Sequence, residues 1–161
     1  MTPAINVVKQ NKIIYKVHEY VHDASSESYG LEAAEKLGVP EERVFKTLVV
    51  SLDSHELAVG ILPVSSMLSM KLIAKVAGAK KALMAAQSDV ERSTGYVLGG
   101  VSPLGQKKRL KTVIDSSALK YPTIYVSAGR RGLEIELAPR DLQKLVNGVI
   151  ADICQETHLS Q

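Results

Sequence analysis

The sequence predicts a mixed α/β (α+β) fold in which one mostly antiparallel sheet is surrounded by short helices. The stretch from Val44 to Leu52 is largely apolar, and most of its apolar residues are β-branched or aromatic, as in a strand covered on both faces. Strand-like and helix-like segments are interspersed along the chain. Short turns such as Asp53-Ser54-His55 indicate hairpins rather than a doubly wound parallel sheet.

Length and composition favour one globular domain over residues 1–161, since 45% of the residues are hydrophobic and 23% are charged. No apolar run approaches the length of about 20 residues that spans a membrane, and Met1 to Ala4 lack the zones of a signal peptide. The single cysteine, Cys154, fits a reducing compartment. We therefore expect a cytoplasmic protein with no membrane partner. The net charge of +3 permits a polyanionic partner without requiring one.

Caps and apolar spacing predict the elements of the first half of the chain. Pro3 after Thr2 is typical of a helix start, and Gly38 is well placed to end a helix. The predicted elements are, in order, a helix from Pro3, a strand at Ile14–Val21, a helix at Tyr29–Leu37, paired strands at Arg43–Leu52 and Glu56–Pro63, and a short helix ending near Gly78.

The second half follows by the same criteria. Ser88-Asp89-Val90-Glu91 has the spacing of a capping box and predicts a helix start. Strands are expected at Thr112–Ile114, Thr123–Ser127 and Leu133–Leu137, followed by a helix from Pro139 to Asn147 that Gly148 closes. The total is about seven strands and four or five short helices.

Several familiar sites are disfavoured. His18 and His22 lie in an extended segment with no nearby Cys or His to complete a zinc set, so we predict no metal and no cofactor. Gly100 and Gly105 have P-loop spacing, but Gln106 stands where that motif needs lysine. Cys154 lies in a polar tail, which argues against a nucleophile.

Lys46 is the sharpest feature of the apolar stretch, because strand alternation places it on one face with Val44, Leu48 and Val50. An isolated buried ammonium group is costly, so this lysine must pair, neutralise or open onto a cavity. Its stem could cover apolar surface while its head reaches water. Alternatively, it is a cavity-facing cation that holds a phosphate, a carbonyl or a developing oxyanion.

Two glycine-flanked turns could approach a ligand closely. The first contains Gly95, Gly99, Gly100 and Gly105, whose backbone can aim N–H groups at an anion, although an irregular turn is an equal alternative. The second runs from Ser127 to Glu134, where a hydroxyl and a carboxylate could orient a substrate amine or a water. The alternative is an ordinary hairpin with an exposed basic tip.

Three spaced motifs resemble one family, the YbaK family, over nearly the whole chain. These motifs are Phe45-Lys46-Thr47, the segment from Ser93 to Lys108, and the segment from Ile124 to Glu134. YbaK proteins are bacterial Cys-tRNA(Pro) deacylases related to the editing domain inserted in prolyl-tRNA synthetases. The resemblance implies a barrel-like sheet with helices around it, and a pocket for the aminoacylated 3′ end of tRNA.

The resemblance also implies roles for individual residues. Lys46 matches the key active-site residue, and we expect it to be catalytic. The expected substrate-binding residues are Tyr20, Tyr29, Thr47, Gly99, Gly100, Ser127 and Glu134. Relatives often carry aspartate at the position of Glu134 and phenylalanine at that of Tyr29. The basic residues expected to attract tRNA phosphates are Lys107, Lys108, Arg109, Arg130 and Arg131.

The implied activity is trans-editing, in which the cysteinyl thiol closes on its own ester carbonyl and releases tRNA(Pro), and Cys-tRNA(Cys) is a further substrate. The implied partners are aminoacylated tRNA and prolyl-tRNA synthetase, not DNA. Two alternatives stay open from the residues: a deacylase for another small amino acid such as alanine, since pocket volume sets that choice, and a non-catalytic module that binds RNA ends or nucleotides.

Overall fold

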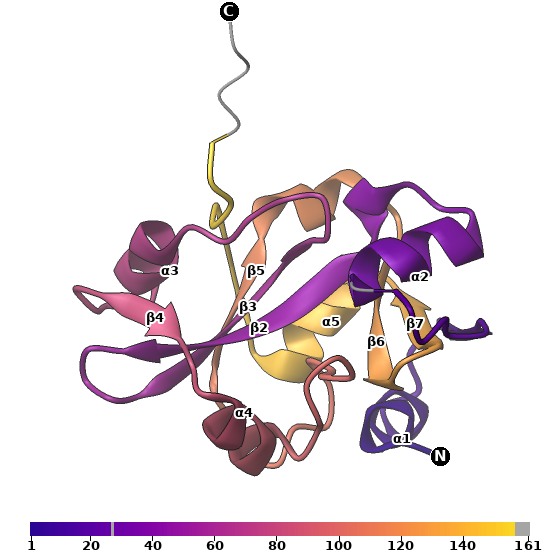
Figure 1. The fold of residues 1–161 in the computed structure, drawn as a ribbon, viewed down its shortest axis with the longest axis horizontal. Helices are drawn as coiled ribbons and strands as arrows, with labels where there is room; N and C mark the ends of the chain where they lie inside the picture. The colour runs from indigo at the N-terminus through magenta and orange to yellow at the C-terminus, as the bar shows by residue number, and fades with distance from the viewer. Residues whose placement is uncertain (27, 157–161) are drawn as a thin grey trace, which may run out of the picture.

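A computed structural model describes residues 1–26 and 28–156 (Figure 1). Within these residues the helices are α1 (Pro3–Gln10), α2 (Tyr29–Leu37), α3 (Met70–Val76), α4 (Gln87–Thr94) and α5 (Pro139–Val146). The strands are β1 (Tyr15–Glu19), β2 (Phe45–Leu52), β3 (Leu57–Pro63), β4 (Ala82–Met84), β5 (Lys111–Asp115), β6 (Ile124–Arg130), β7 (Leu133–Leu137) and β8 (Val149–Ala151).

The strands form two sheets. One has the order β1-β7-β6 and is antiparallel throughout. The other has the order β4-β2-β3-β5-β8, in which β5 pairs in parallel with both β3 and β8 while the other pairs are antiparallel. The mixed, mostly antiparallel class is therefore confirmed.

The expected barrel-like closure is wrong. Among the described residues, a single isolated bridge between Val44 and Tyr125 joins the two sheets, so hydrogen bonding does not continue from one sheet into a closed ring. A β-bulge between Ser127 and Arg130 shifts the register of β6 on β7 near the turn. The two sheets stay open and enclose a core where they face each other.

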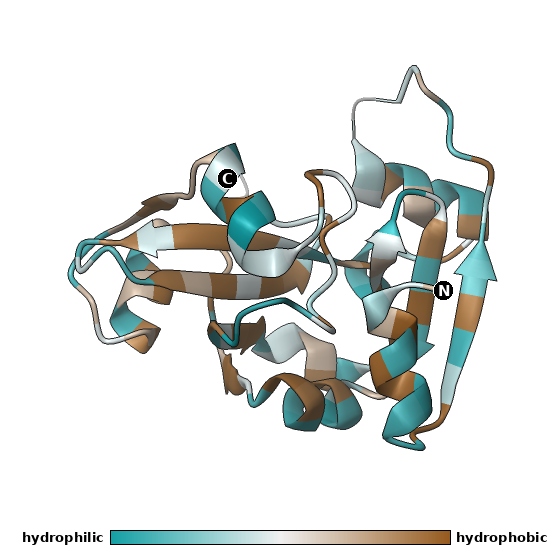
Figure 2. Cartoon of the chain, turned by 90° about the horizontal axis from the view of Figure 1, so that it is seen from below, coloured by the Kyte–Doolittle hydropathy of each residue, from teal (hydrophilic) through white to brown (hydrophobic). Residues whose placement is uncertain are grey.

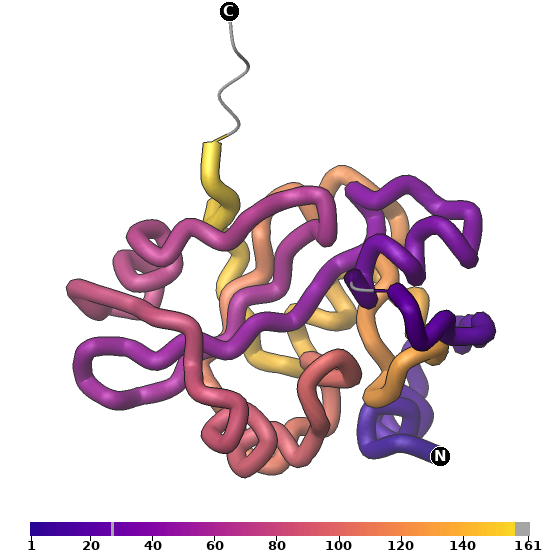
Figure 3. The backbone as a smooth tube through the Cα atoms, viewed as in Figure 1, coloured from indigo at the N-terminus to yellow at the C-terminus, as the bar shows by residue number. Residues whose placement is uncertain are grey.

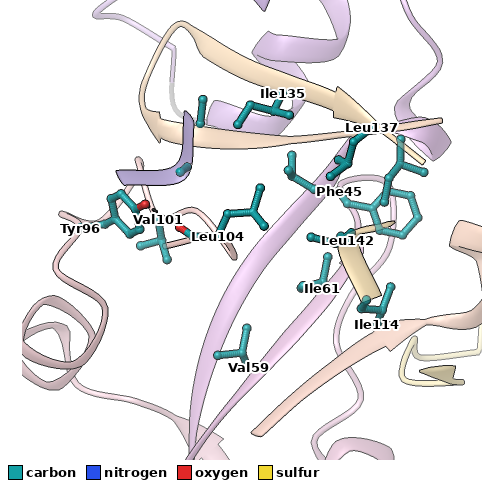
Figure 4. Packing of buried hydrophobic residues seen from close by; sticks show 14 of the residues in the cluster. Phe45, Val59, Ile61, Tyr96, Val101, Leu104, Ile114, Ile135, Leu137 and Leu142 are labelled. Atoms are coloured by element: carbon teal, nitrogen blue, oxygen red, sulfur yellow. Dashed lines mark hydrogen bonds between the residues drawn. The ribbon is translucent and has the colours of Figure 1, made fainter. Parts of the chain in front are cut away.

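Side chains from both sheets fill this core (Figure 4). Phe45 of β2, Leu137 of β7 and Leu142 of α5 are almost fully buried in one cluster. Burial of each such side chain contributes roughly 1.5–3 kcal/mol relative to exposure. In Figure 2 the long central strands are largely brown, while the helices carry teal residues as well, as expected for elements with one face in the core. The core thus fixes β2 against β6 and β7.

Two of the predicted caps are correct and two are wrong. Thr2 Oγ1 accepts a hydrogen bond from Ile5 N (3.2 Å) at the start of α1, and Gly38 ends α2 in the left-handed conformation. However, α4 begins at Gln87 with Ala86 as its N-cap, so Ser88 is inside the helix. Asn147, at φ 52°, provides the left-handed cap of α5 in place of Gly148. Asn tolerates this conformation better than most residues, which explains the earlier end.

The strands β4 and β8 were missed, and both have three residues. Each adds to a sheet edge, β4 beside β2 and β8 beside β5, so partners distant in sequence define them. The strand β1 is shorter than Ile14–Val21, and β6 continues past Ser127 to Arg130. No helix of the described ranges is long and apolar enough to cross a membrane.

The glycine loop after α4, residues 95–106, folds back on the helix that it leaves (Figure 3). Lys107 N donates to Thr94 O (3.0 Å) and Lys108 N donates to Ser93 O (2.9 Å), which closes the base of the loop. Inside it, the hydroxyl of the buried Tyr96 donates to Leu104 O (2.6 Å). The loop is therefore held by specific bonds rather than by its glycines alone.

Candidate functional site

A cavity of about 320 Å³ opens between the N-terminus of α2, the first half of β2, the β6–β7 turn and the glycine loop. This volume lies at the lower end of the range of about 300–1,000 Å³ that is usual for small-molecule sites. Many of the predicted site residues line it: Tyr20, Tyr29, Lys46, Thr47, Gly99, Ser127, Arg130, Arg131 and Glu134. With Tyr20, which follows β1, residues from five separate segments thus converge on one cavity.

The other predicted residues do not line this cavity. A Cβ atom on Gly100 would lie 3.0 Å from Arg130 Cα, so this glycine lets the loop pack against the β6–β7 turn. Lys108 and Arg109 line a separate groove of about 440 Å³ together with Lys144 of α5. Lys107 lines neither of these two hollows.

Lys46, whose position on an apolar strand left two settings open, lies in the lining of this cavity. The side chain is half-buried, and Nζ donates a hydrogen bond to Ser66 O (2.6 Å). Burial lowers the pKa of Lys46, because desolvation disfavours the charged form. In the described part of the chain, no carboxylate lies within ion-pair distance of it, so the cation is left for an incoming oxygen atom.

Glu134 is the second buried ionisable group of the cavity. It lies on β7 opposite Ser127 of β6, and it is only 6% exposed. Burial raises the pKa of its carboxyl to about 8. The side chain of Glu134 makes no hydrogen bond or ion pair among those found in residues 1–26 and 28–156. The carboxyl group is therefore mostly protonated at neutral pH, and it can both donate and accept a hydrogen bond.

Three hydroxyl groups complete the polar lining. Ser127 Oγ accepts from Gly129 N (3.1 Å), which leaves the hydroxyl proton free to donate. Thr47 Oγ1 is buried without a hydrogen-bond partner among the described residues. Burial, and next the charge of Glu134, raise the pKa of Tyr20. The cavity thus offers the ammonium of Lys46, the guanidinium groups of Arg130 and Arg131, one neutral acid and several hydroxyls.

The wall of the cavity at α2 depends on close packing. A Cβ atom on Gly30 would lie 2.2 Å from Val64 Cγ1, so only glycine lets α2 approach the segment after β3. The neighbouring Tyr29 lies under the guanidinium of Arg131, whose Cζ is 3.5 Å from the ring centroid. Gly99, at φ 90°, touches both: a Cβ there would be 2.7 Å from Tyr29 Cε2 and 2.8 Å from Arg131 Nε.

Two side chains behind this wall were not predicted from the sequence. His22 Nδ1 lies 2.6 Å from Glu32 Oε1, and His22 Nε2 lies 3.1 Å from Arg131 Nη1. The sequence disfavoured a metal role for His22 and left it as a solvated or hydrogen-bonded histidine, without naming its partners. The ten-residue spacing to Glu32 across a loop has no periodic signal that could have revealed the pair.

The surroundings of Cys154 differ from the expected polar tail, but they still argue against a nucleophile. Cys154 is half-buried, and its backbone forms an isolated antiparallel β-bridge with Leu68 instead of extending into solvent. Burial, with the nearby Asp115 carboxylate, raises the pKa of its thiol to about 11. A neutral thiol is a weak nucleophile. The described residues also contain no group of three or more His, Cys, Asp or Glu side chains arranged to hold a metal ion.

Comparisons with known proteins agree on one family. A family model described as an aminoacyl-tRNA editing domain matches residues 27–145. The sequence is 40% identical to the Enterococcus faecalis protein named "Putative Cys-tRNA(Pro)/Cys-tRNA(Cys) deacylase EbsC", over 94% of this chain and 92% of that one. It is 27% identical to the Bacillus subtilis "Uncharacterized protein YwhH", over 78% and 80% of the two chains.

A solved structure shares the fold. It is described as "a putative trans-editing enzyme for prolyl tRNA synthetase", and its TM-score to this chain is 0.82. The two sequences are 22% identical, and the match covers 97% of this chain and 99% of the other.

Proposed function

Because the chain belongs to the aminoacyl-tRNA editing domain family, we propose that it is a deacylase that removes cysteine from mischarged Cys-tRNA(Pro), with Cys-tRNA(Cys) as a further substrate. The observation that carries the proposal is the half-buried ammonium of Lys46 in a small polar cavity. The cavity lining contains no cysteine or histidine side chain that could serve as a nucleophile or its base. We therefore propose, as the family resemblance implies, that the thiol of the substrate is the attacking group.

The chemistry is an intramolecular acyl transfer. The sulfur of the bound cysteinyl group forms a bond to its own ester carbonyl carbon, and the bond from that carbon to the ribose oxygen breaks. The thiol proton passes to the ribose oxygen. The products are a free 3′ end and a cyclic thioester of cysteine, which water then opens to cysteine. Holding the thiol near the carbonyl replaces a protein nucleophile.

Lys46 is placed to stabilise the oxyanion that develops on the ester carbonyl. A preorganised cation in a desolvated site is more effective than one in water. The donor proton of Ser127 and the neutral carboxyl of Glu134 are suited to orient the α-amine and the sulfur-bearing side chain. Tyr20, Tyr29, Thr47 and the backbone of Gly99 shape the rest of the substrate-binding surface, with Gly100 supporting the loop.

The context of the reaction is part of the proposal. Residues 1–161 act as one editing domain in the cytoplasm. The cavity is small enough to read only the acyl end of the tRNA, so selection of tRNA(Pro) needs a partner such as prolyl-tRNA synthetase. Arg130 and Arg131 at the cavity, and Lys107, Lys108 and Arg109 outside it, attract the phosphates.

The test is deacylation of Cys-tRNA(Pro), Ala-tRNA(Pro) and Cys-tRNA(Cys) by the wild type and by Lys46→Ala. We expect loss of the cysteinyl substrates with wild type and a fall of roughly 10²-fold or more with the variant, as for loss of an oxyanion-stabilising donor. Lys16→Ala, on the exposed surface of β1, is the matched control and should retain activity.

Three outcomes would contradict this proposal. Preferential loss of Ala-tRNA(Pro) would assign an alanine deacylase. Binding of tRNA without loss of any acyl group would assign a non-catalytic module. Release of serine from Ser-tRNA(Pro) as fast as cysteine would show that the thiol does not attack.

A further inference from the structure

Four side chains form a continuous series of contacts at the mouth of the cavity. Glu32 of α2 contacts His22, His22 contacts Arg131 of the β6–β7 turn, and Arg131 stacks on Tyr29. The series connects a carboxylate that is 5% exposed with a guanidinium group on the surface. The catalytic roles proposed above use neither Glu32 nor His22.

The hydrogen bonds determine the tautomer of His22. A guanidinium group has donors and no acceptor, so Arg131 Nη1 must donate to His22 Nε2. Nε2 is then unprotonated, and Nδ1 carries the proton that it donates to Glu32 Oε1 (2.6 Å). The imidazole ring is therefore neutral in this arrangement, with a carboxylate on one side and a cation on the other.

The carboxylate is itself held in place. Asp23 N donates to Glu32 Oε2 (2.7 Å), and Lys36 Nζ lies 3.8 Å from the same oxygen. Burial raises the pKa of Glu32, but the bonds from Asp23 and His22 outweigh it, so that the pKa is lowered overall. Glu32 thus stays ionised and presents a fixed acceptor to His22.

Arg131 is fixed on its other sides as well. Its Cζ lies 3.5 Å from the centroid of the Tyr29 ring, and its Nε and Nη2 lie against Gly99, where a Cβ would be 2.8 and 2.9 Å away from them. The bond from Nη1 to His22 is the one hydrogen bond of this guanidinium within the described residues. The remaining donors are therefore preorganised for a ligand at the cavity mouth.

We propose that Glu32 and His22 are positioning residues that hold Arg131 against Tyr29, so that its guanidinium binds a phosphate of the terminal RNA nucleotides at the cavity mouth. Guanidinium donors match phosphate oxygens in pairs, which a flexible lysine does not. A cavity of about 320 Å³ leaves the phosphates on the 5′ side of the acylated terminal ribose at its rim. The choice of RNA as ligand rests on the proposed function.

Protonation of His22 breaks this arrangement. An imidazolium would direct an Nε2–H at the Nη1 donor of Arg131, so two donors and two positive charges would face each other. The carboxylates of Glu32 and Asp23 favour the imidazolium, while Arg131 and Lys36 oppose it. Phosphate binding by Arg131 in this position therefore requires the neutral form of His22.

The test uses a short RNA that ends in CCA and carries no amino acid, and it measures the Kd for this RNA by fluorescence anisotropy. His22→Ala should raise the Kd by about tenfold, as for loss of a charge-assisted hydrogen bond, and should raise KM more than it lowers kcat. His22→Gln keeps an acceptor for Arg131, so its Kd should be close to that of the wild type.

The matched control is His18→Gln, which removes the other histidine–glutamate pair (His18 Nε2 to Glu136 Oε1, 2.8 Å) away from the cavity. It should leave the Kd unchanged. In an Arg131→Ala background, His22→Ala should have no further effect, because both act through the same guanidinium group. Thermal unfolding confirms that each variant is folded.

The inference would be overturned by additive effects of His22→Ala and Arg131→Ala, or by a Kd of His22→Gln as high as that of His22→Ala. Nitrogen NMR of His22 is a test that is independent of activity. A proton on Nε2 near pH 7.5 would also contradict the inference, because the hydrogen bonds place it on Nδ1. Failure of the proposed function would be recognised separately. It would appear as an absence of deacylation by the wild type, independently of the RNA-binding and NMR results.

Discussion

Burial acts on the two ionisable groups of the cavity in opposite senses. Desolvation lowers the pKa of Lys46 and raises that of Glu134, so both groups are shifted toward their neutral forms. An ion pair between them would instead favour both charged forms, and none is found within 4.0 Å among the described residues. The cavity therefore presents polar groups whose hydrogen bonds a bound acyl ester and amine would complete.

Glu134 should make stability decrease as the pH rises. The folded carboxyl keeps its proton up to a pKa of about 8, whereas the unfolded one loses it near the ordinary pKa of 4.5. Between these values the native state binds one more proton, which corresponds to a fall of at most about 1.4 kcal/mol in the free energy of unfolding per pH unit. Urea unfolding should show that Glu134→Gln removes this decline.

Glu136→Gln is the matched control on the same strand. Burial raises the pKa of Glu136, but hydrogen bonds from Thr123 and His18 outweigh it and lower that pKa overall. Glu136 therefore stabilises the folded state above the pKa that it has in the unfolded chain, and this stabilisation is lost as the pH falls toward its folded pKa. Glu136→Gln should therefore alter stability on the acid side. An unchanged decline between about pH 5 and 8 in Glu134→Gln would contradict the assignment.

The environments of single residues were partly predictable. Lys46 stood out because an ammonium group interrupts an apolar strand, and the structure does place it in a cavity. The burial of Glu134 was not predictable, since the same alternating pattern suits an exposed hairpin. His22 and Glu32 were missed because their contact depends on how a loop folds over α2.

At the scale of elements, the sequence predicted the helices and strands that depend on neighbouring residues better than those that depend on tertiary contacts. The apolar run of β2, the Pro3 start of α1 and the Gly38 end of α2 are determined by neighbouring residues, and all three are present. The short strands β4 and β8 exist through pairing with β2 and β5, which no local pattern encodes. Closure of a barrel likewise depends on contacts between sheets, and that expectation was wrong.

The glycine loop should tolerate no side chain at Gly99. A methyl group there would lie 2.7 Å from Tyr29 Cε2 and 2.8 Å from Arg131 Nε, and φ is 90°. Gly99→Ala should therefore displace Tyr29 or Arg131 and raise KM about tenfold or more, beyond a backbone cost of roughly 1–3 kcal/mol. Steady-state deacylation and urea unfolding measure the two effects.

Gly78→Ala separates strain from steric conflict. Gly78 has φ 78°, but nothing lies within 4 Å of the position of its Cβ, and it follows α3 away from the cavity. Its substitution should lower stability by a similar amount and leave KM unchanged. If both variants changed KM equally, contact with Tyr29 and Arg131 would not be the cause.

At the scale of the whole molecule, two groups of basic residues line separate hollows. Arg130 and Arg131 line the cavity, whereas Lys108 and Arg109 line a separate groove with Lys144. The net charge of +3 is too small to indicate this division. An RNA whose acylated end occupies the cavity would contact the first set with its terminal nucleotides, and only a longer RNA would extend to the second.

Salt dependence should separate the two sets. For a short single-stranded RNA ending in CCA, replacement of Arg130 and Arg131 by Ala should reduce the slope of log Kd against log salt by about 0.7 for each phosphate that the variant no longer neutralises. Replacement of Lys107, Lys108 and Arg109 should leave that slope unchanged. With full-length tRNA, the second variant should reduce the slope too, by about 0.9 for each duplex phosphate. An equal reduction by both variants on the short RNA would mean that the two sets act on the same phosphates.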